Sequence, residues 1–238
     1  EVFVRDWLVR AEAQMEVSMQ AIYDILVRTN HSCTVDPATE LAECYKASAR
    51  LRMGLLPIDR FLNGYTYFIN HLSEKRGVAP IAIHGTFQVH QGMVAKIHRF
   101  REARLFFDDE TYYSDCPRLV AYDNRLPDWA AQGQSPTPRV RDQLYLHFDL
   151  VHHQLRQLRA ALAIAEALGR AVLLPRFECL LDNSWYAAMG AWPGFRLRGP
   201  FHCPADHLLN IEGMLRHFGQ GRFREHSFLQ NPRAPAAM

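Results

Sequence analysis

The chain has 238 residues, of which 48% are hydrophobic and 22% are charged, and this is the composition of an ordinary folded globular protein. It excludes a disordered, collagen-like or coiled-coil chain. The net charge is only +2 and the basic residues are scattered along the sequence, so we expect no nucleic acid among the partners.

The five cysteines place little constraint on the fold. They form no CxxC pair and no Cys/His ladder with zinc spacing, which gives a structural zinc site little support. Their spacing permits one disulfide, such as Cys179 to Cys203, without requiring it. An odd number leaves at least one thiol unpaired if any disulfide forms, and the spacing does not decide the redox compartment.

The start of the sequence indicates a partial chain. It begins with Glu1, without an initiator methionine or a signal peptide. No segment reaches the ~20 consecutive apolar residues of a membrane span. We therefore expect a membrane anchor only upstream of this sequence.

The first quarter of the chain predicts two helices. In residues 1–28, apolar side chains recur at helical spacing between charges, which predicts a long amphipathic packing helix. Asp36 and Pro37, followed by Glu40, resemble a helix cap and predict a second helix that ends near residue 50.

The pattern then changes to the alternation of strands and helices that is typical of an α/β fold. Residues 53–57 predict a short strand, residues 60–64 a turn with a glycine suited to positive φ, and residues 79–84 a buried strand. Residues 92–104 are rich in good helix formers, and residues 105–109 are strand-like.

The least regular segment is residues 114–142, which contains several prolines and predicts a linker. We therefore expect a first α/β domain at residues 1–113. Residues 143–238 are expected to form a smaller C-terminal α/β region.

A βαβ unit is predicted after this linker. It consists of a strand at 143–148, a helix at 151–168 that Gly169 ends, and a strand at 171–175. Ligands bind at the carboxyl ends of strands in open α/β sheets. The residues that follow the second strand are therefore candidates for the rim of a crevice: Glu178, Asp182, Asn183 and Trp185.

The sequence contains no motif that is diagnostic of a known mechanism: it has no P-loop, GxGxxG, HExxH or GxSxG. His84 lies at a predicted strand end, where a neutral imidazole can bind a divalent metal, and Lys96 follows where a cation can neutralise a diphosphate. The alternatives are a hydrogen-bonded structural histidine and a solvated basic helix face formed by Lys96, Arg99, Arg101 and Arg104.

Two further groups of polar residues are candidate sites. Asp108, Asp109 and Glu110 follow an apolar segment and could bind a metal that bridges phosphates, but a helix cap is the favoured interpretation. Asp206 and His207 could act as an acid–base pair, although such sequence neighbours are more often part of a turn. We assign that pair no catalytic role.

Several short segments follow one another in an order that is hard to obtain by chance. In the first half they are residues 54–57, 61–64 and 83–88, and in the second half residues 173–175 and 200–207. Together they resemble the closing part of the nucleotide-diphospho-sugar transferase domain of glycosyltransferase family 77 and the region after it. The resemblance is greatest to plant and algal arabinosyltransferases that extend arabinose chains on hydroxyproline-rich cell-wall glycoproteins.

This resemblance implies a GT-A-like fold, with residues 1–113 as the C-terminal part of that domain. It also implies a UDP-sugar donor, a divalent metal such as Mn, and retaining transfer to a hydroxyproline-rich glycoprotein or glycan acceptor. It also implies that the full-length protein is a type II membrane protein of the Golgi lumen. Carried over by position, His84 completes the metal site and Lys96 binds the diphosphate. Thr86 and Gln88 line the donor pocket, and Asn63 and Gly64 form the turn beneath it.

The sequence departs from the family pattern at the DxD motif, which supplies the metal's carboxylates. It has no counterpart here, and Asp108 and Asp109 come too late to replace it. Because these ligands offset the charge of two phosphates, we expect this chain alone to be a partial, inactive enzyme. Two alternatives stay open: a non-catalytic glycan- or partner-binding module that uses Trp185, Tyr186 and Trp192, and a GT-B-like transferase similar to fucosyltransferases.

Overall fold

The computed structural model describes residues 32–39, 41–46, 49–54, 56–88, 92–132, 140–181, 191–192, 195–196 and 199–235, with Arg5, Leu8, Val9 and Glu12 before them. The chain divides into two compact units, Glu1–Pro57 and Ile58–Met238. The helix predicted for residues 1–28 lies almost wholly outside the described residues.

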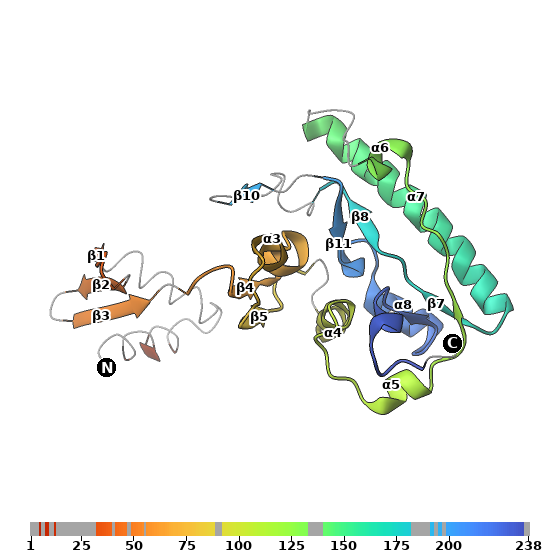
Figure 1. Ribbon diagram of the computed structural model, residues 1–238, viewed down its shortest axis with the longest axis horizontal. Coiled ribbons are helices and arrows are strands. Elements are labelled where there is room, and N and C mark those ends of the chain that lie inside the picture. The colour runs from red at the N-terminus through yellow and green to blue at the C-terminus, as the bar shows by residue number, and fades with distance from the viewer. Residues whose placement is uncertain are drawn as a thin grey trace. The chain divides into compact units, whose positions relative to one another are not determined.

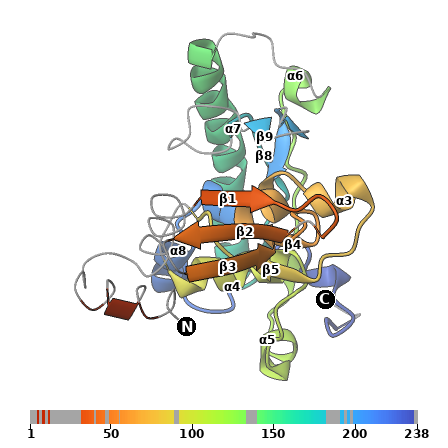
Figure 2. The ribbon, with the colours of Figure 1, turned by 90° about the vertical axis from the view of Figure 1, so that its left-hand side faces the viewer.

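The first unit contains a three-stranded antiparallel sheet in the order β1-β2-β3 (Figure 2). The strands are β1 (Ser32–Val35), β2 (Leu41–Lys46) and β3 (Ala49–Gly54). Cys33 and Cys44 lie opposite each other in the β1–β2 register and are joined by a disulfide. This cross-strand bond ties the first hairpin together.

The helix predicted from Asp36 to about residue 50 is wrong, because Asp36 forms a turn. Its carboxylate accepts hydrogen bonds from the Ala38 backbone N–H at 2.9 Å and from the Thr39 hydroxyl at 2.8 Å. An aspartate that binds its own backbone two residues on is typical of a turn as well as of a helix cap. The pairing of β1 and β2 on either side makes this turn part of a hairpin, and the local pattern of residues 36–40 does not reveal those strands.

The second unit begins with two parallel strands and a short helical crossover (Figure 1). Strand β4 (Phe61–Asn63) leads into the π-helix η1 (Tyr65–Ile69) and the helix α3 (Leu72–Arg76), and β5 (Ala82–His84) returns to pair with β4 in parallel. The predicted strand at residues 79–84 is confirmed at its C-terminal end, but its predicted burial is wrong, because Ala82 and His84 are exposed. The turn predicted at 60–64 is wrong, because most of it is β4.

Helix α4 (Met93–Glu102) confirms the helix predicted over 92–104. After the short helix α5 (Glu110–Ser114), strand β6 (Leu119–Val120) lies within the segment that was predicted to be a linker. It pairs in parallel with β7 (Ala171–Leu173). The described residues of this segment, 114–132 and 140–142, are therefore part of the second unit.

The βαβ unit of the second half exists, but with a different first strand. Helix α7 (Val140–Ala167) is the crossover between β6 and β7, and it includes residues 143–148, which were predicted to be a strand. Short apolar runs fit either structure. The period of the buried positions is helical: Leu150, Gln154, Leu158, Ala161 and Ala165.

The remaining strands complete two small sheets around the end of this unit. Strands β8 (Phe177–Cys179) and β11 (Phe201–Cys203) are antiparallel, and β12 (Phe223–Arg224) adds a third parallel strand beside β7. The other elements are the short strands β9 (Ala191–Trp192) and β10 (Phe195–Arg196), the 3₁₀ helices η2 (Ala205–His207) and η3 (Phe228–Gln230), the short helix α6 (Asp128–Ala131), and the helix α8 (Ile211–Phe218).

One hydrophobic core joins the two halves of the second unit. Tyr65 and Ile69 from η1 belong to the same buried cluster as Leu158 from α7, Val172 from β7 and Phe223 from β12. The predicted division at 114–142 thus does not separate two cores. Among the described residues, none of the helices combines the length and apolar character that a membrane crossing requires.

Candidate functional site

The carboxyl ends of β4 and β5 bring four of the six predicted site residues together. Asn63 and His84 are direct partners in the parallel register. The Gly64 backbone N–H donates to the Thr86 hydroxyl over 3.3 Å. A Cβ atom added to Gly64 would lie 1.7 Å from the Thr86 carbonyl oxygen, so this approach of two backbones requires glycine.

Asn63 itself is engaged in starting the crossover helix. Its side-chain oxygen accepts the Thr66 N–H at 2.9 Å, while the Asn63 N–H donates to the Thr66 hydroxyl at 3.0 Å. This is the reciprocal arrangement of a helix-capping box. The side-chain oxygen of Asn63 therefore has a structural role at the strand end.

The loop after His84 is held by its own backbone and by one arginine. The Thr86 N–H donates to the His84 carbonyl at 2.7 Å, and the Gln88 amide donates to the Gly85 carbonyl at 3.3 Å. The Arg99 guanidinium donates to the carbonyl of Phe87 at 2.6 Å and to that of Thr86 at 3.4 Å. Phe87 has a φ of 60°, which for a residue with a side chain needs such support.

Arg99 is paired with an aspartate from the far end of the chain. The Arg99 Nε atom donates to Asp206 Oδ1 at 2.5 Å, and the two side chains are only 1% and 0% exposed. Burial raises the pKa of Asp206, although Arg99 beside it acts in the opposite direction. The pair fixes the 85–88 loop to the η2 turn.

Sequence reasoning missed these two residues. Arg99 was weighed as part of a solvated basic face, and Asp206 was assigned to a turn. A signal was present, because Ala95, His98, Arg99 and Glu102 share one face of α4 by their spacing of three, four and seven residues. The structure buries that face, so the interpretation of Arg99 as solvated is wrong.

Glu102 lies about one helical turn after Arg99 on α4 and anchors the same η2 turn. Its carboxylate accepts the Ala205 N–H at 3.1 Å and lies 3.6 Å from His98 Nε2 and 3.9 Å from His226 Nδ1. Burial by itself raises the pKa of Glu102, but the nearby imidazoles of His226 and His98 hold that pKa below its ordinary value. The carboxylate stays ionised inside the protein.

The residues predicted to bind metal and diphosphate are more open. His84 is exposed and Lys96 is half-buried on α4. No hydrogen bond or ion pair joins the Lys96 ammonium to another described side chain, so it is available to a ligand. Within the described residues, no group of three or more His, Cys, Asp or Glu side chains is arranged to hold a metal ion. His84 therefore lacks companion ligands in this part of the chain.

The acidic cluster at 108–110 follows the cap interpretation in part. Asp109 occupies the N-cap position of α5, but its side chain accepts no capping hydrogen bond. Asp108 is buried and forms an ion pair with Arg101, which is three-quarters buried. Asp108 thus has a structural role.

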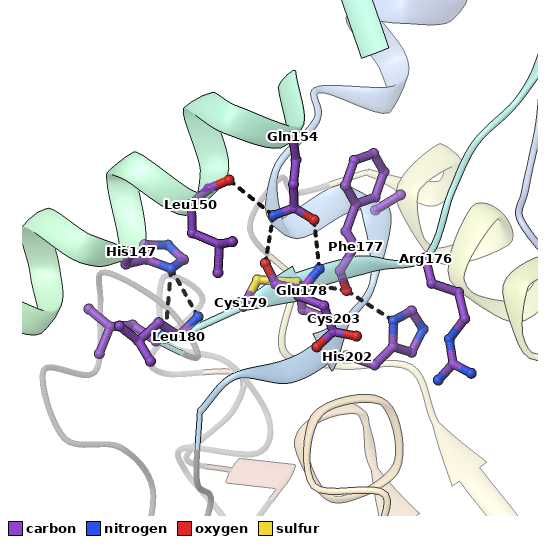
Figure 3. Close-up of a disulfide and its surroundings, with 12 residues drawn as sticks. His147, Leu150, Gln154, Arg176, Phe177, Glu178, Cys179, Leu180, His202 and Cys203 are labelled. Atoms are coloured by element: carbon purple, nitrogen blue, oxygen red, sulfur yellow. Dashed lines mark hydrogen bonds between the residues drawn. A yellow bond between two sulfur atoms is a disulfide. The ribbon is translucent and has the colours of Figure 1, made fainter. Parts of the chain in front are cut away.

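Of the residues predicted for a crevice rim after β7, Glu178 lies next to the Cys179–Cys203 disulfide (Figure 3). Gln154 of α7 accepts the Glu178 N–H at 3.0 Å and donates to the Glu178 carbonyl at 2.9 Å, which fastens strand β8 to the helix. Burial raises the pKa of the Glu178 carboxyl. The other rim and platform residues, Asp182, Asn183, Trp185 and Tyr186, lie outside the described residues, as does the side chain of Trp192.

Comparison with known proteins gives one relationship in sequence. The chain is 35% identical over 197 residues to Arabinosyltransferase XEG113 of Arabidopsis thaliana, and these residues are 80% of this chain. No protein-family model matches the chain, and no solved structure matches it. The chain spans 30% of the length of the Arabidopsis protein. The chain is therefore similar in sequence to a part, about a third, of a protein named as an arabinosyltransferase, and arabinosyltransferases are glycosyltransferases.

Proposed function

We propose that this chain is part of a glycosyltransferase of the arabinosyltransferase kind, of family 77, and that the ends of β4 and β5 help to bind its UDP-sugar donor. The observation that carries the proposal is the 35% identity over 197 residues to Arabinosyltransferase XEG113. Identity of this degree over four-fifths of the chain supports a common fold and a common type of chemistry.

The geometry at the strand ends supports the donor site. Ligands of open α/β sheets bind outside the carboxyl ends of parallel strands, and Gly64 lets the end of β4 lie against the Thr86 backbone, which fixes the loop after β5 at this edge. The charge of Arg99 is buried and matched by Asp206. Lys96 is therefore the cation of this group that is free to offset the charge of a diphosphate.

The described residues do not by themselves fit the divalent metal that the family resemblance implies. His84 is a suitable ligand, but a Mn ion held against two phosphates also needs carboxylate oxygens. No set of companion ligands accompanies His84 in the described part of the chain. In this proposal the carboxylates come from sequence upstream of the chain, and Lys96 with the loop backbone makes the local contribution to binding.

The compartment and the acceptor follow from the same proposal. The two disulfides, Cys33–Cys44 and Cys179–Cys203, are typical of proteins that mature in an oxidising compartment. They support the Golgi lumen as the location of the full-length protein. The acceptor, a hydroxyproline-rich glycoprotein or glycan, is proposed from the family resemblance alone. A thiol-trapping measurement on protein from its own secretory pathway, with and without reductant, tests the first point.

The donor site is tested by thermal unfolding of the purified chain with UDP, with and without Mn. We expect UDP to raise the melting temperature, because a ligand that binds the folded state stabilises it by mass action. The rise should be smaller for Lys96→Ala and, with Mn present, for His84→Ala. The exposed residues of α7 supply matched controls, His152→Ala and Arg156→Ala, which should respond like the parent.

Each outcome decides one part of the proposal. An unchanged melting temperature in the parent chain, with the fold intact by circular dichroism, means that these strand ends do not bind the donor. Equal responses of Lys96→Ala and Arg156→Ala would remove Lys96 from the site. A longer protein that transfers sugar equally well with and without Lys96→Ala would contradict the proposed role of the strand ends.

A further inference from the structure

A polar cavity lies in the second unit, and it is separate from the residues at the β4–β5 strand ends. Its volume is about 460 Å³, and its walls come from α4, the loop before α5, α5 itself, α8 and β12. None of the six predicted donor-site residues lines it. A cavity of this volume is within the range that small-molecule sites occupy, about 300 to 1,000 Å³.

One wall of this cavity carries two arginines stacked on one tyrosine. The Arg101 and Arg224 guanidiniums lie 4.0 Å and 4.5 Å from the centre of the Tyr112 ring. The Tyr112 hydroxyl donates to Glu225 at 2.6 Å, and Arg101 is paired with Asp108. These groups hold one another in place, so the wall is preorganised.

One lining side chain is buried and has a polar atom without a hydrogen bond. Arg224 is 5% exposed, and its Nε atom has no hydrogen-bond partner among the described residues. His98, 4% exposed, also lines the cavity, and its Nε2 atom lies 3.6 Å from the Glu102 carboxylate. Most buried polar groups are satisfied, and the exceptions call for an explanation such as a bound molecule or ordered water.

The charge of the cavity lining selects the class of ligand. Two guanidiniums face three carboxylates, those of Asp108, Asp109 and Asp115. The excess of carboxylate repels a phosphate or another anion. The described residues here do not include a three-ligand group that could hold a metal ion. The lining therefore disfavours an anion, and its carboxylates and guanidiniums offer a neutral polyol both acceptors and donors of hydrogen bonds.

The opposite wall is apolar. Val94 and Ile97 from α4 face the cavity together with Ile211 and Leu215 from α8. A sugar ring has a face of C–H groups that packs on such a wall, and a rim of hydroxyls that can donate to carboxylates and accept from guanidiniums. From these observations we propose that the cavity binds one neutral sugar unit of a glycan.

The ligand class is tested by isothermal titration of the purified chain with four probes. The neutral probes are L-arabinose and an arabinose trisaccharide, and the charged probes are glucuronate and glucosamine. We expect the neutral probes to bind and glucuronate to bind at least about tenfold more weakly, because it adds a charge of the same sign as the excess carboxylates. Tighter binding of glucuronate or of glucosamine than of the neutral sugars would overturn the assignment.

The location is tested by variants at the exposed rim, where the fold tolerates change. The double variant Asp109→Ala/Asp115→Ala removes two acceptors of sugar hydroxyls and should weaken binding about tenfold or more. Leu215→Trp fills the cavity from its apolar wall and should abolish binding. The matched control, Asp128→Ala/Asp149→Ala, changes two exposed carboxylates outside the cavity and should bind like the parent.

No binding of either neutral sugar, or equal binding by the parent and by both cavity variants, would overturn the proposal. The titration contains no UDP and no metal. Its result is therefore independent of the donor site at the ends of β4 and β5, and either proposal can fail while the other stands.

Discussion

His147 of α7 shows how burial sets the protonation state of a single side chain (Figure 3). Its Nδ1 atom accepts the backbone N–H groups of Leu180 and Leu181 at 3.3 Å and 3.4 Å. A protonated ring has no free acceptor. Burial lowers the pKa of His147 from its ordinary value of 6.5 to about 4, so the folded protein keeps the neutral form.

Stability should therefore fall on acidification through His147. Above pH 6.5 the folded and unfolded states both hold a neutral ring, and the full stability is present. Between pH 6.5 and about 4 only the unfolded state takes up the proton, which lowers the free energy of unfolding by ~1.4 kcal/mol per pH unit. Buried His202, whose pKa is also lowered to about 4, adds to the same trend.

The contribution of His147 is isolated by comparing urea unfolding of the parent and His147→Gln from pH 7 to pH 4.5. The unfolding free energy of the variant should fall less steeply with decreasing pH, and the difference in slope should be the contribution of one histidine, ~1.4 kcal/mol per pH unit. His152→Gln, at an exposed position of the same helix, should keep the parent slope. Parallel slopes for the parent and His147→Gln would show that the ring is already protonated in the fold.

The Arg99–Asp206 pair gives a second prediction for single residues. Asp206→Asn leaves the Arg99 charge buried without a counter-charge, and this should cost about 3 kcal/mol or more of unfolding free energy. The Arg125–Asp123 pair has a similar distance, 3.1 Å, but is 84% and 77% exposed. Asp123→Asn should therefore cost less than about 1 kcal/mol in the same denaturant titration. Similar losses for both variants would contradict the buried role.

At the scale of elements, the β4–β5 unit depends on the contact between two backbones. Gly64→Ala places a methyl group 1.7 Å from the Thr86 carbonyl, so the strand or the loop must move. We expect a loss of about 2 to 3 kcal/mol or more, measured by chemical unfolding. In Gly92→Ala the new methyl group meets its nearest atom, Glu212 Oε2, at 3.6 Å, an ordinary contact, and this control should lose well under 1 kcal/mol. A fully stable Gly64→Ala protein would disprove the close approach.

Local sequence pattern predicted some elements and missed others. Helix α4, the end of β5 and the stop at Gly169 follow from local pattern, and Gly169 has the expected positive φ of 61°. Residues 143–148 were predicted as a strand because a short apolar run has no period of its own. The hairpin at 32–46 was missed because its Asp36 turn has the same local chemistry as a helix cap.

Less of the candidate site could be predicted than of the fold. The strand-end position of His84 is visible in the sequence, and the structure places Asn63, Gly64 and Thr86 beside it. The partners that hold the loop could not be found in this way. Asp206 is 107 residues from Arg99, and no local pattern encodes a pair at such a separation.

At the scale of the whole molecule, the second unit contains a complete core of its own. The buried cluster runs from Tyr65 to Phe223 and takes its members from both halves of that unit. We therefore predict that residues 58–238 fold without residues 1–57. Circular dichroism and thermal unfolding of the shortened chain should give a cooperative transition within a few degrees of the corresponding transition of the full chain. A shortened chain that stays unfolded would show that the first unit completes the core.

The bond between Arg99 and Asp206 also has a consequence for synthesis. A growing polypeptide emerges from the ribosome N-terminus first, so the loop at 85–88 is exposed well before the η2 turn has been translated. Until Asp206 arrives, the positive charge that supports this loop has no counter-ion inside the protein. The loop is therefore among the last parts of the nascent chain to reach its final shape, and a premature stop between residues 132 and 199 would leave it unfinished.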